Sequence, residues 1–347
     1  MGDFVKKIRF GTVSVLTLAF LFAGNILYGI YPSSGNPVLS YICISVFLPV
    51  ITFIVSSYFL SGKNISRKRH SSFLAVLFCV FTVIPLSYTV SVYTSALGSF
   101  AKYYSSAQVV VFAVVSVVIS GICTARKGVT AVMGLARMSV WFMIVWIFAG
   151  WLGFAHTKNI VPPLSPFRLL DDTDFVDIAI KGIISAVDIV LLFVVLTDNR
   201  NIDEKKHILP QIMSGVWLYI AVSGVNMLKN LLLFGSDFLG RLDNPDLAAI
   251  RLIPMFELPE ISVVVDTVSA VLKISVYLCA VFYALKDAFA EKYRAPVVSA
   301  ATGIAVCGIS FVVVYIKEAT DAAEILSAAS VLICAAVCMV FFSEKEK

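Results

Sequence analysis

Charge is scarce in this chain of 347 residues, of which only 14% are Asp, Glu, Lys or Arg. Soluble globular domains carry about 25% of these residues. Hydrophobic residues make up 59% instead, and the mean hydropathy is +0.93. The composition therefore excludes a pair of water-soluble domains and indicates an all-α integral membrane protein that sits in the lipid bilayer.

Residues for catalysis or metal binding are also few. The chain has three His, and none of its seven Cys belongs to a Cys-x-x-Cys pair, so neither a zinc site nor a disulfide framework is indicated. No nucleophile–base pair or carboxylate dyad is evident, and we expect no enzyme, metal or cofactor. No basic run with interleaved aromatic residues occurs, so nucleic acid is not an expected partner.

Long apolar runs dominate what remains. A membrane-spanning helix needs about 20 apolar residues, and ten segments meet this requirement. The sixth is the least regular, because Lys181 and Asp188 interrupt it. The predicted spans are 10–31, 38–60, 73–95, 107–125, 135–155, 175–197, 210–234, 260–285, 296–316 and 323–342.

Basic residues are unevenly divided between the connections. Most of the 27 Lys and Arg residues fall on the side of the membrane that holds both termini. The opposite side holds few, and Lys229 is counted among them. Because cytoplasmic loops are enriched in Lys and Arg, both termini are predicted to be cytoplasmic, which requires an even number of spans.

The spans fall into two halves of nearly equal length, about 10–155 and about 175–343. Five spans is an odd number, so the second half enters the membrane from the opposite face. This is the inverted repeat of many secondary transporters. We therefore predict one transmembrane domain over 1–347 with a LeuT-like 5+5 fold, in which helices 1 and 6 are broken at mid-membrane.

Polar residues in those two helices are the candidate ligand site. Gly24, Asn25 and Gly29 lie where the first span would break, and freed backbone N–H groups there would suit a carboxylate. Ser185 and Asp188 lie in the sixth span, and an acid inside a membrane is a functional candidate. A face of small residues that packs against another helix is the alternative for Gly24.

The eighth span carries Asp266 and Lys273 on one helical face. Lys273 lies near the middle of the span, where a lysine must be neutralised, paired or in contact with water. One interpretation is that Lys273 replaces a sodium ion and bridges to the broken first helix. Structural attachment between helices is the alternative.

A polar stretch at 235–259 separates the seventh and eighth spans. Asn244, Pro245 and Asp246 form a helix start, with a cap residue, a proline and an acid near the positive end. We predict two short helices that form a lid on the outer face, positioned by Arg251 and Glu257. A solvated amphipathic loop is the alternative.

Residues 233–280 contain Phe234, Gly235, Pro245, Arg251, Asp266 and Lys273 in this order. With this pattern, the stretch and its flanks resemble the B subunit of spore germinant receptors, the GerAB family. The resemblance extends to Arg137 in 128–140 and to the loop 159–166. Asn244 departs from it, because the family has an aromatic residue there, and Asp188 stands where the family commonly has Gly-x-Glu.

The resemblance implies a fold of the amino acid–polyamine–organocation transporter superfamily. It also implies a germinant-sensing subunit that binds a small nutrient such as an amino acid. Its expected partners are the larger A subunit and the lipoprotein C subunit of a germination receptor in the spore inner membrane. An ion-coupled amino acid transporter, or permease, of the same fold is the alternative.

Overall fold

The computed structural model describes most of the chain as helices. It covers residues 12–28, 37–61, 72–104, 107–157, 188–193, 195–196, 202–239, 242, 245–252, 260–288 and 295–315. Within these ranges the chain is all-helical and has no strand. A helix satisfies its backbone hydrogen bonds within one segment, which is what an apolar run in lipid requires.

The helices match the predicted spans closely in position. Those in the first half are α1 (Thr12–Tyr28), α2 (Pro37–Ser61), α3 (Ser72–Tyr104), α4 (Ala107–Arg126) and α5 (Val129–His156). Those in the second half are α7 (Ile202–Phe234), α8 (Ser236–Leu239), α9 (Pro245–Arg251), α10 (Glu260–Ala288) and α11 (Ala295–Tyr315). Residues 188–193 and 195–196 of the predicted sixth span are helical too, and we call them the Asp188 segment. The predicted tenth span lies outside the described residues.

Five of the described helices, α3, α4, α5, α7 and α10, are long and apolar enough to cross a membrane. Shorter apolar stretches occur in α1, α2 and α11. Large apolar side chains stand on the outside of the bundle, among them Phe112 and Trp141. Exposed side chains of this kind are stable against lipid and unfavourable in water. The structure therefore supports a multi-pass membrane protein.

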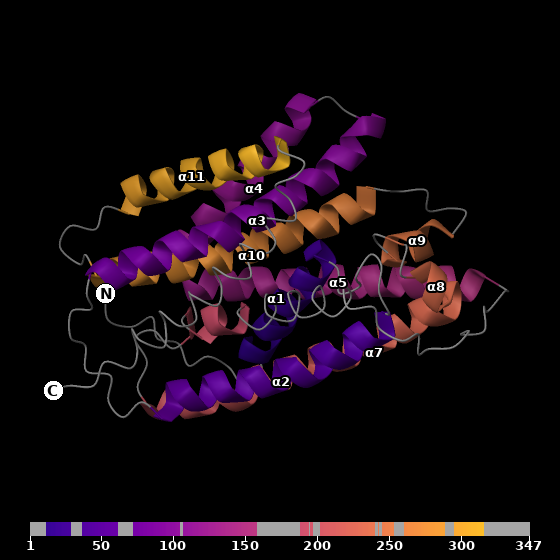
Figure 1. The fold of residues 1–347 in the computed structure, drawn as a ribbon, viewed down its shortest axis with the longest axis horizontal. Coiled ribbons are helices and arrows are strands. Elements are labelled where there is room, and N and C mark those ends of the chain that lie inside the picture. The colour runs from indigo at the N-terminus through magenta and orange to yellow at the C-terminus, as the bar shows by residue number, and fades with distance from the viewer. Residues whose placement is uncertain are drawn as a thin grey trace.

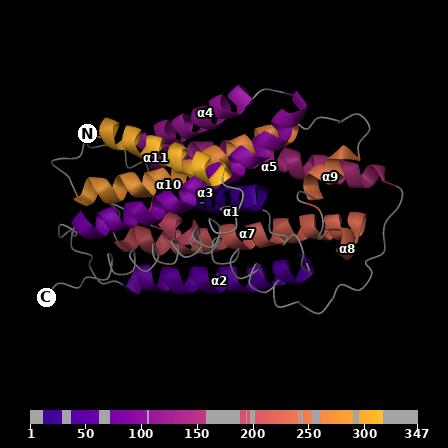
Figure 2. The same cartoon turned by 45° about the horizontal axis from the view of Figure 1, so that its top comes forward.

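The central helix of the bundle is α10, which packs against α1, α3, α4 and α5. Figures 1 and 2 show α4 and α11 at one edge of the bundle and α2 and α7 at the opposite edge. Every residue of α10 from Leu272 to Ala280 is buried. A helix that is buried on all sides must be apolar all round, so a charged residue in this part of α10 needs a partner.

Helices α1 and α7 approach each other closely. A Cβ atom added to Gly215 would lie 2.6 Å from the Thr17 Cβ and 2.7 Å from the Ser14 carbonyl oxygen. The Ser14 hydroxyl also donates a hydrogen bond of 2.8 Å to the Gln211 carbonyl. Small residues permit this approach of two backbones, as is common between membrane helices.

The polar stretch between α7 and α10 contains the two short helices α8 and α9. Gly235 ends α7 with a φ of 72°, which favours glycine, and its N–H donates to the Leu231 carbonyl. Pro245 is the first residue of α9, as the predicted helix start requires. Both short helices lie at one end of the bundle (Figures 1 and 2).

The predicted break in helix 1 does not occur at Gly24 or Asn25, and Gly29, the third residue of the predicted break, lies outside the described residues. The α1 helix continues through both residues and ends at Tyr28. Gly24 has another reason for lacking a side chain, which is the lysine that packs against it, as described below. The predicted break in helix 6 falls on residues before Asp188, outside the described part of the chain.

We expect Gly215→Ala to loosen the α1–α7 contact at a cost of about 1–3 kcal/mol, because the added methyl meets backbone and Cβ atoms. Gly134→Ala is the matched control, since a Cβ there has nothing within 4 Å. Replacing a glycine inside a helix by alanine stabilises the helix by about 0.5–1 kcal/mol. The apparent melting temperature of the purified protein in detergent should fall in the first variant only. Equal shifts in both variants would contradict this account of the contact.

Candidate functional site

A buried ion pair lies at the centre of the bundle. The Lys273 ammonium of α10 contacts the Asp188 Oδ2, and the two side chains are 0% and 3% exposed. The Tyr277 hydroxyl, one turn further along α10, donates a hydrogen bond of 2.6 Å to the Asp188 Oδ1. Both carboxylate oxygens therefore have a partner from α10.

Helix α1 supplies an aromatic ring and a glycine beside this pair. The Lys273 Nζ lies 4.4 Å from the centroid of the Phe20 ring, a distance typical of a cation–π contact. A Cβ atom on Gly24 would lie 2.8 Å from the same Nζ and 3.5 Å from the Asp188 Oδ2. Any larger residue at position 24 would push the ammonium away from its carboxylate.

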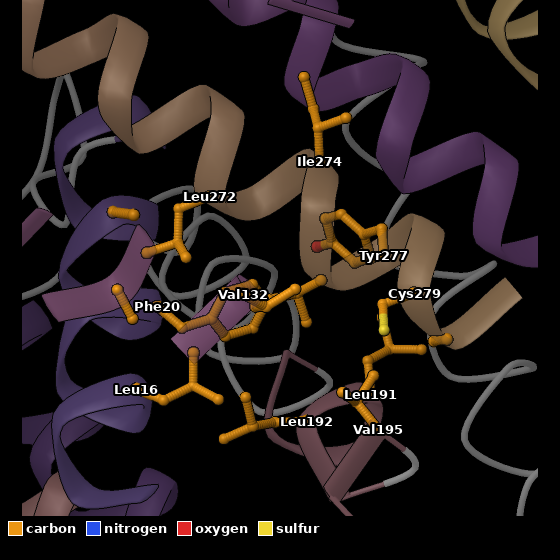
Figure 3. Close-up of a cluster of buried hydrophobic side chains, with 14 of the residues drawn as sticks. Leu16, Phe20, Val132, Leu191, Leu192, Val195, Leu272, Ile274, Tyr277 and Cys279 are labelled. Atoms are coloured by element: carbon orange, nitrogen blue, oxygen red, sulfur yellow. The ribbon is translucent and has the colours of Figure 1, made fainter. Parts of the chain in front are cut away.

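The pair is surrounded by apolar side chains. Figure 3 shows Leu16 and Phe20 from α1 facing Leu191 and Leu192 of the Asp188 segment, with Leu272 and Tyr277 from α10 beside them. These side chains exclude water from the two charges. A single charge left in such a place costs about 3–5 kcal/mol, so each charge keeps the other there.

The structure brings together three of the predicted site residues, Gly24, Asp188 and Lys273. Asn25 follows Gly24 on α1 and is half-buried. Ser185 lies outside the described residues. The carboxylate that pairs with Lys273 therefore comes from the Asp188 segment, and the contact of Lys273 with α1 is to the Phe20 ring and Gly24.

The remaining predicted residues lie elsewhere. Asp266 is half-buried and lies about 10 Å along α10 from Lys273, the rise of two helical turns. Arg251 is the last residue of α9, and its side chain is not among those described. Glu257 lies outside the described residues, so the predicted role of Arg251 and Glu257 in the lid stays a prediction.

A second buried ion pair, which the sequence analysis missed, attaches α9 to α7. The Lys229 ammonium of α7 lies 3.0 Å from the Asp246 Oδ1, and the Lys229 side chain is fully buried. Asn230 donates to the same oxygen at 2.8 Å. Asn226 donates to both carboxylate oxygens, at 2.9 and 2.8 Å. We call these four residues the Asp246 cluster.

The sequence did contain a signal for this cluster. Lys229 was counted with the outer connections, but it lies inside α7 and pairs with Asp246, so that count was wrong for this residue. Lys229 and Asn230 lie three and four residues after Asn226, so both are neighbours of Asn226 on the helix surface. Three polar residues on one face of an apolar helix predict a polar partner on a neighbouring element.

Two glycines of α5 leave room for α9 and for the lysine that pairs with it. A Cβ atom on Gly150 would lie 2.5 Å from the Lys229 Nζ, and one on Gly153 would overlap the Ala249 carbonyl oxygen of α9. Ile250 of α9 packs with Trp146 of α5 and Val265 of α10. The short helix is therefore held by one carboxylate and by close backbone packing on α5.

The two charged groups of the central site can each exchange their present partner for another group of opposite charge. The negative group of Asp188 and the positive group of Lys273 are in contact with each other and lie beside an aromatic ring. Within the described part of the chain, no group of three or more His, Cys, Asp or Glu side chains is placed to hold a metal ion. No protein-family model matches the chain, and no curated protein matches it.

We expect Lys273→Met to lower the apparent melting temperature strongly, because it leaves the Asp188 carboxylate buried without its cation, at a cost of about 3–5 kcal/mol. Adding Asp188→Asn to Lys273→Met should restore most of the loss, since neither charge is then present. The double-mutant cycle measures this coupling. Additive losses in the double variant would show that the two side chains do not depend on each other.

Proposed function

We propose that this protein is a transporter-like membrane receptor that binds a small zwitterion, such as an amino acid, at the Asp188–Lys273 pair. The observation that carries the proposal is a buried acid and base, contributed by two separate helical segments in the middle of an apolar bundle. Ionisable residues inside a membrane protein are costly and usually have a function.

A zwitterion fits this pair by exchange of partners. The ammonium of an amino acid would pair with Asp188 in place of Lys273, and its carboxylate would pair with the released Lys273. Each charge then keeps an opposite charge, so the desolvation penalty of the site changes little. The Phe20 ring, which lies against the Lys273 ammonium, is positioned to receive the ammonium of the ligand instead.

Ligand binding would also produce a signal. A molecule inserted between Asp188 and Lys273 moves the Asp188 segment relative to α10, and α10 packs against α1, α3, α4 and α5. A ligand that binds the separated arrangement more tightly shifts the population toward it. In this way a transporter-like bundle acts as a sensor that neighbouring subunits can read.

The resemblance of 233–280 to the GerAB family makes the receptor a germinant-sensing B subunit. We propose the corresponding LeuT-like fold with ten spans, assembly with the A and C subunits, and the spore inner membrane as location. Cytoplasmic termini are supported by Arg126 and Lys127, which precede α5, whereas α9 packs near the other end of α5 at Gly153.

An ion-coupled amino acid transporter is the second candidate. The observation in its favour is the position of the Lys273 ammonium, which neutralises Asp188 as a coupling cation would. Uptake into proteoliposomes separates the two functions. Accumulation of an amino acid driven by a sodium or proton gradient would favour the transporter, and binding without accumulation would favour the receptor.

We expect a zwitterionic amino acid to raise the melting temperature of the purified protein. The same compound without its amino group, or without its carboxylate, should raise it much less, because one of the two exchanged ion pairs is lost. A panel of amino acids measured by thermal shift checks this expectation. Equal shifts with all three compound types would exclude recognition by the Asp188–Lys273 pair.

In spores, Phe20→Leu should weaken the response to the germinant by about thirtyfold, the effect of losing about 2 kcal/mol from a buried cation–π contact. The variant keeps the ion pair, so the protein should remain folded. Phe112→Ala is the matched control, because Phe112 is 74% exposed on the outside of α4. The germination dose–response is measured at equal receptor abundance. Asp188→Asn should abolish it, and an unchanged response in Asp188→Asn and Phe20→Leu would exclude this site.

A further inference from the structure

Tyr277 contacts both the acid of the central ion pair and the aromatic ring beside it. Its hydroxyl donates a hydrogen bond of 2.6 Å to the Asp188 Oδ1. Its ring packs edge-on against the Phe20 ring (Figure 3), with 6.1 Å between the centroids and 69° between the planes. The residue is buried, with 1% of its surface exposed. The ring contact is separate from the hydrogen bond, and it fixes the direction in which the hydroxyl points.

The two carboxylate oxygens of Asp188 are consequently not equivalent. The Tyr277 hydroxyl binds Oδ1, whereas the Lys273 ammonium contacts Oδ2. A Cβ atom on Gly24 would lie 3.5 Å from the same Oδ2 and 2.8 Å from the Lys273 Nζ, so Gly24 borders the place that the ammonium occupies. A cation that replaces this ammonium therefore meets one carboxylate oxygen, because the other is already bound.

Ammonium and guanidinium groups use a carboxylate differently. An ammonium is a compact point charge, and one carboxylate oxygen is enough to pair with it. A guanidinium is a planar fork that gains most by donating two parallel hydrogen bonds, one to each carboxylate oxygen. A carboxylate with one oxygen already bound suits the first group and not the second.

We propose that Tyr277 is a positioning residue that sets the specificity of the Asp188–Lys273 site. By holding the Asp188 Oδ1, it admits ligands that carry an ammonium and rejects those with a guanidinium or amidinium in the same place. This role rests on the proposed function, in which the ammonium of a ligand replaces that of Lys273 at Asp188. It concerns the charged group that pairs with Asp188, and not the side chain of the ligand.

The test compares dissociation constants for matched probes, measured by titration of the detergent-purified protein. The probes are glycine, valine and phenylalanine, each paired with its N-amidino derivative, in which a guanidinium replaces the ammonium (guanidinoacetate for glycine). In the unsubstituted chain, we expect the derivative of each bound amino acid to bind about tenfold more weakly or worse. A hydrogen bond to a charged group contributes about this factor, and the derivative lacks its second one.

Tyr277→Phe removes the hydroxyl and keeps the ring that packs on Phe20. We expect it to reduce the preference for the amino acid over its derivative by about tenfold, because Oδ1 can then accept the second hydrogen bond of the guanidinium. Tyr93→Phe is the matched control, since Tyr93 is also 1% exposed and its hydroxyl is hydrogen-bonded to the Thr267 Oγ1 at 2.8 Å. The preference should not change in this control.

Equal affinities for an amino acid and its derivative in the unsubstituted chain would overturn this role of Tyr277, and that measurement needs no variant. An unchanged preference in folded Tyr277→Phe, or the same change in Tyr93→Phe, would overturn it too. In each of these cases the amino acid still binds, so the proposed function is retained. If none of the three amino acids binds the unsubstituted chain, the proposed function and the role of Tyr277 are both contradicted.

Discussion

A charge that is enclosed by apolar helices remains only if its counter-charge stays beside it. Asp188 and Lys273 meet this condition at the centre of the bundle, and much of the surrounding structure follows from it. The fully buried part of α10 is where Lys273 lies, so α10 cannot move away from the Asp188 segment without separating the two charges. Phe20 and Gly24 fix α1 against the same ammonium. Three segments that are distant in the sequence are thus held at one point.

The Asp246 cluster repeats this arrangement at the edge of the bundle. In both places a buried lysine on a long helix pairs with an aspartate from another segment, and its ammonium lies against a glycine of a third. The surroundings differ. The central pair is enclosed by leucine and aromatic side chains, whereas Asp246 is reached by amides and is partly exposed. When the outer pair separates, water can therefore solvate its two charges.

The sequence predicted the helices well because the signal was strong. Apolar runs of span length gave all the long helices in the described residues, and Pro245 marked the start of α9. It also identified Asp188 and Lys273 as residues that need partners, but not that they partner each other, because that contact joins segments 85 residues apart. Only the packing of the helices brings them together.

The interpretations of Gly24 and of Lys229 were wrong for a related reason. Gly24 was interpreted through its backbone freedom, but the structure uses its missing side chain to make room for Lys273. Lys229 was assigned by its position near the end of a span, although Asn226 and Asn230 on the same face pointed to a buried polar contact. A sequence shows that a residue is small or charged, but the role of that residue depends on the neighbouring helix.

The contact of each lysine with a glycine has a consequence for how this sequence can change over time. A side chain larger than hydrogen at position 24 or 150 would occupy the volume that an ammonium now fills. The planar guanidinium of arginine is larger than an ammonium and does not replace it in so narrow a space. Position 24 is therefore tied to position 273, and position 150 to position 229. We therefore expect a larger residue at either glycine position to be tolerated best when the lysine of the same pair is changed too.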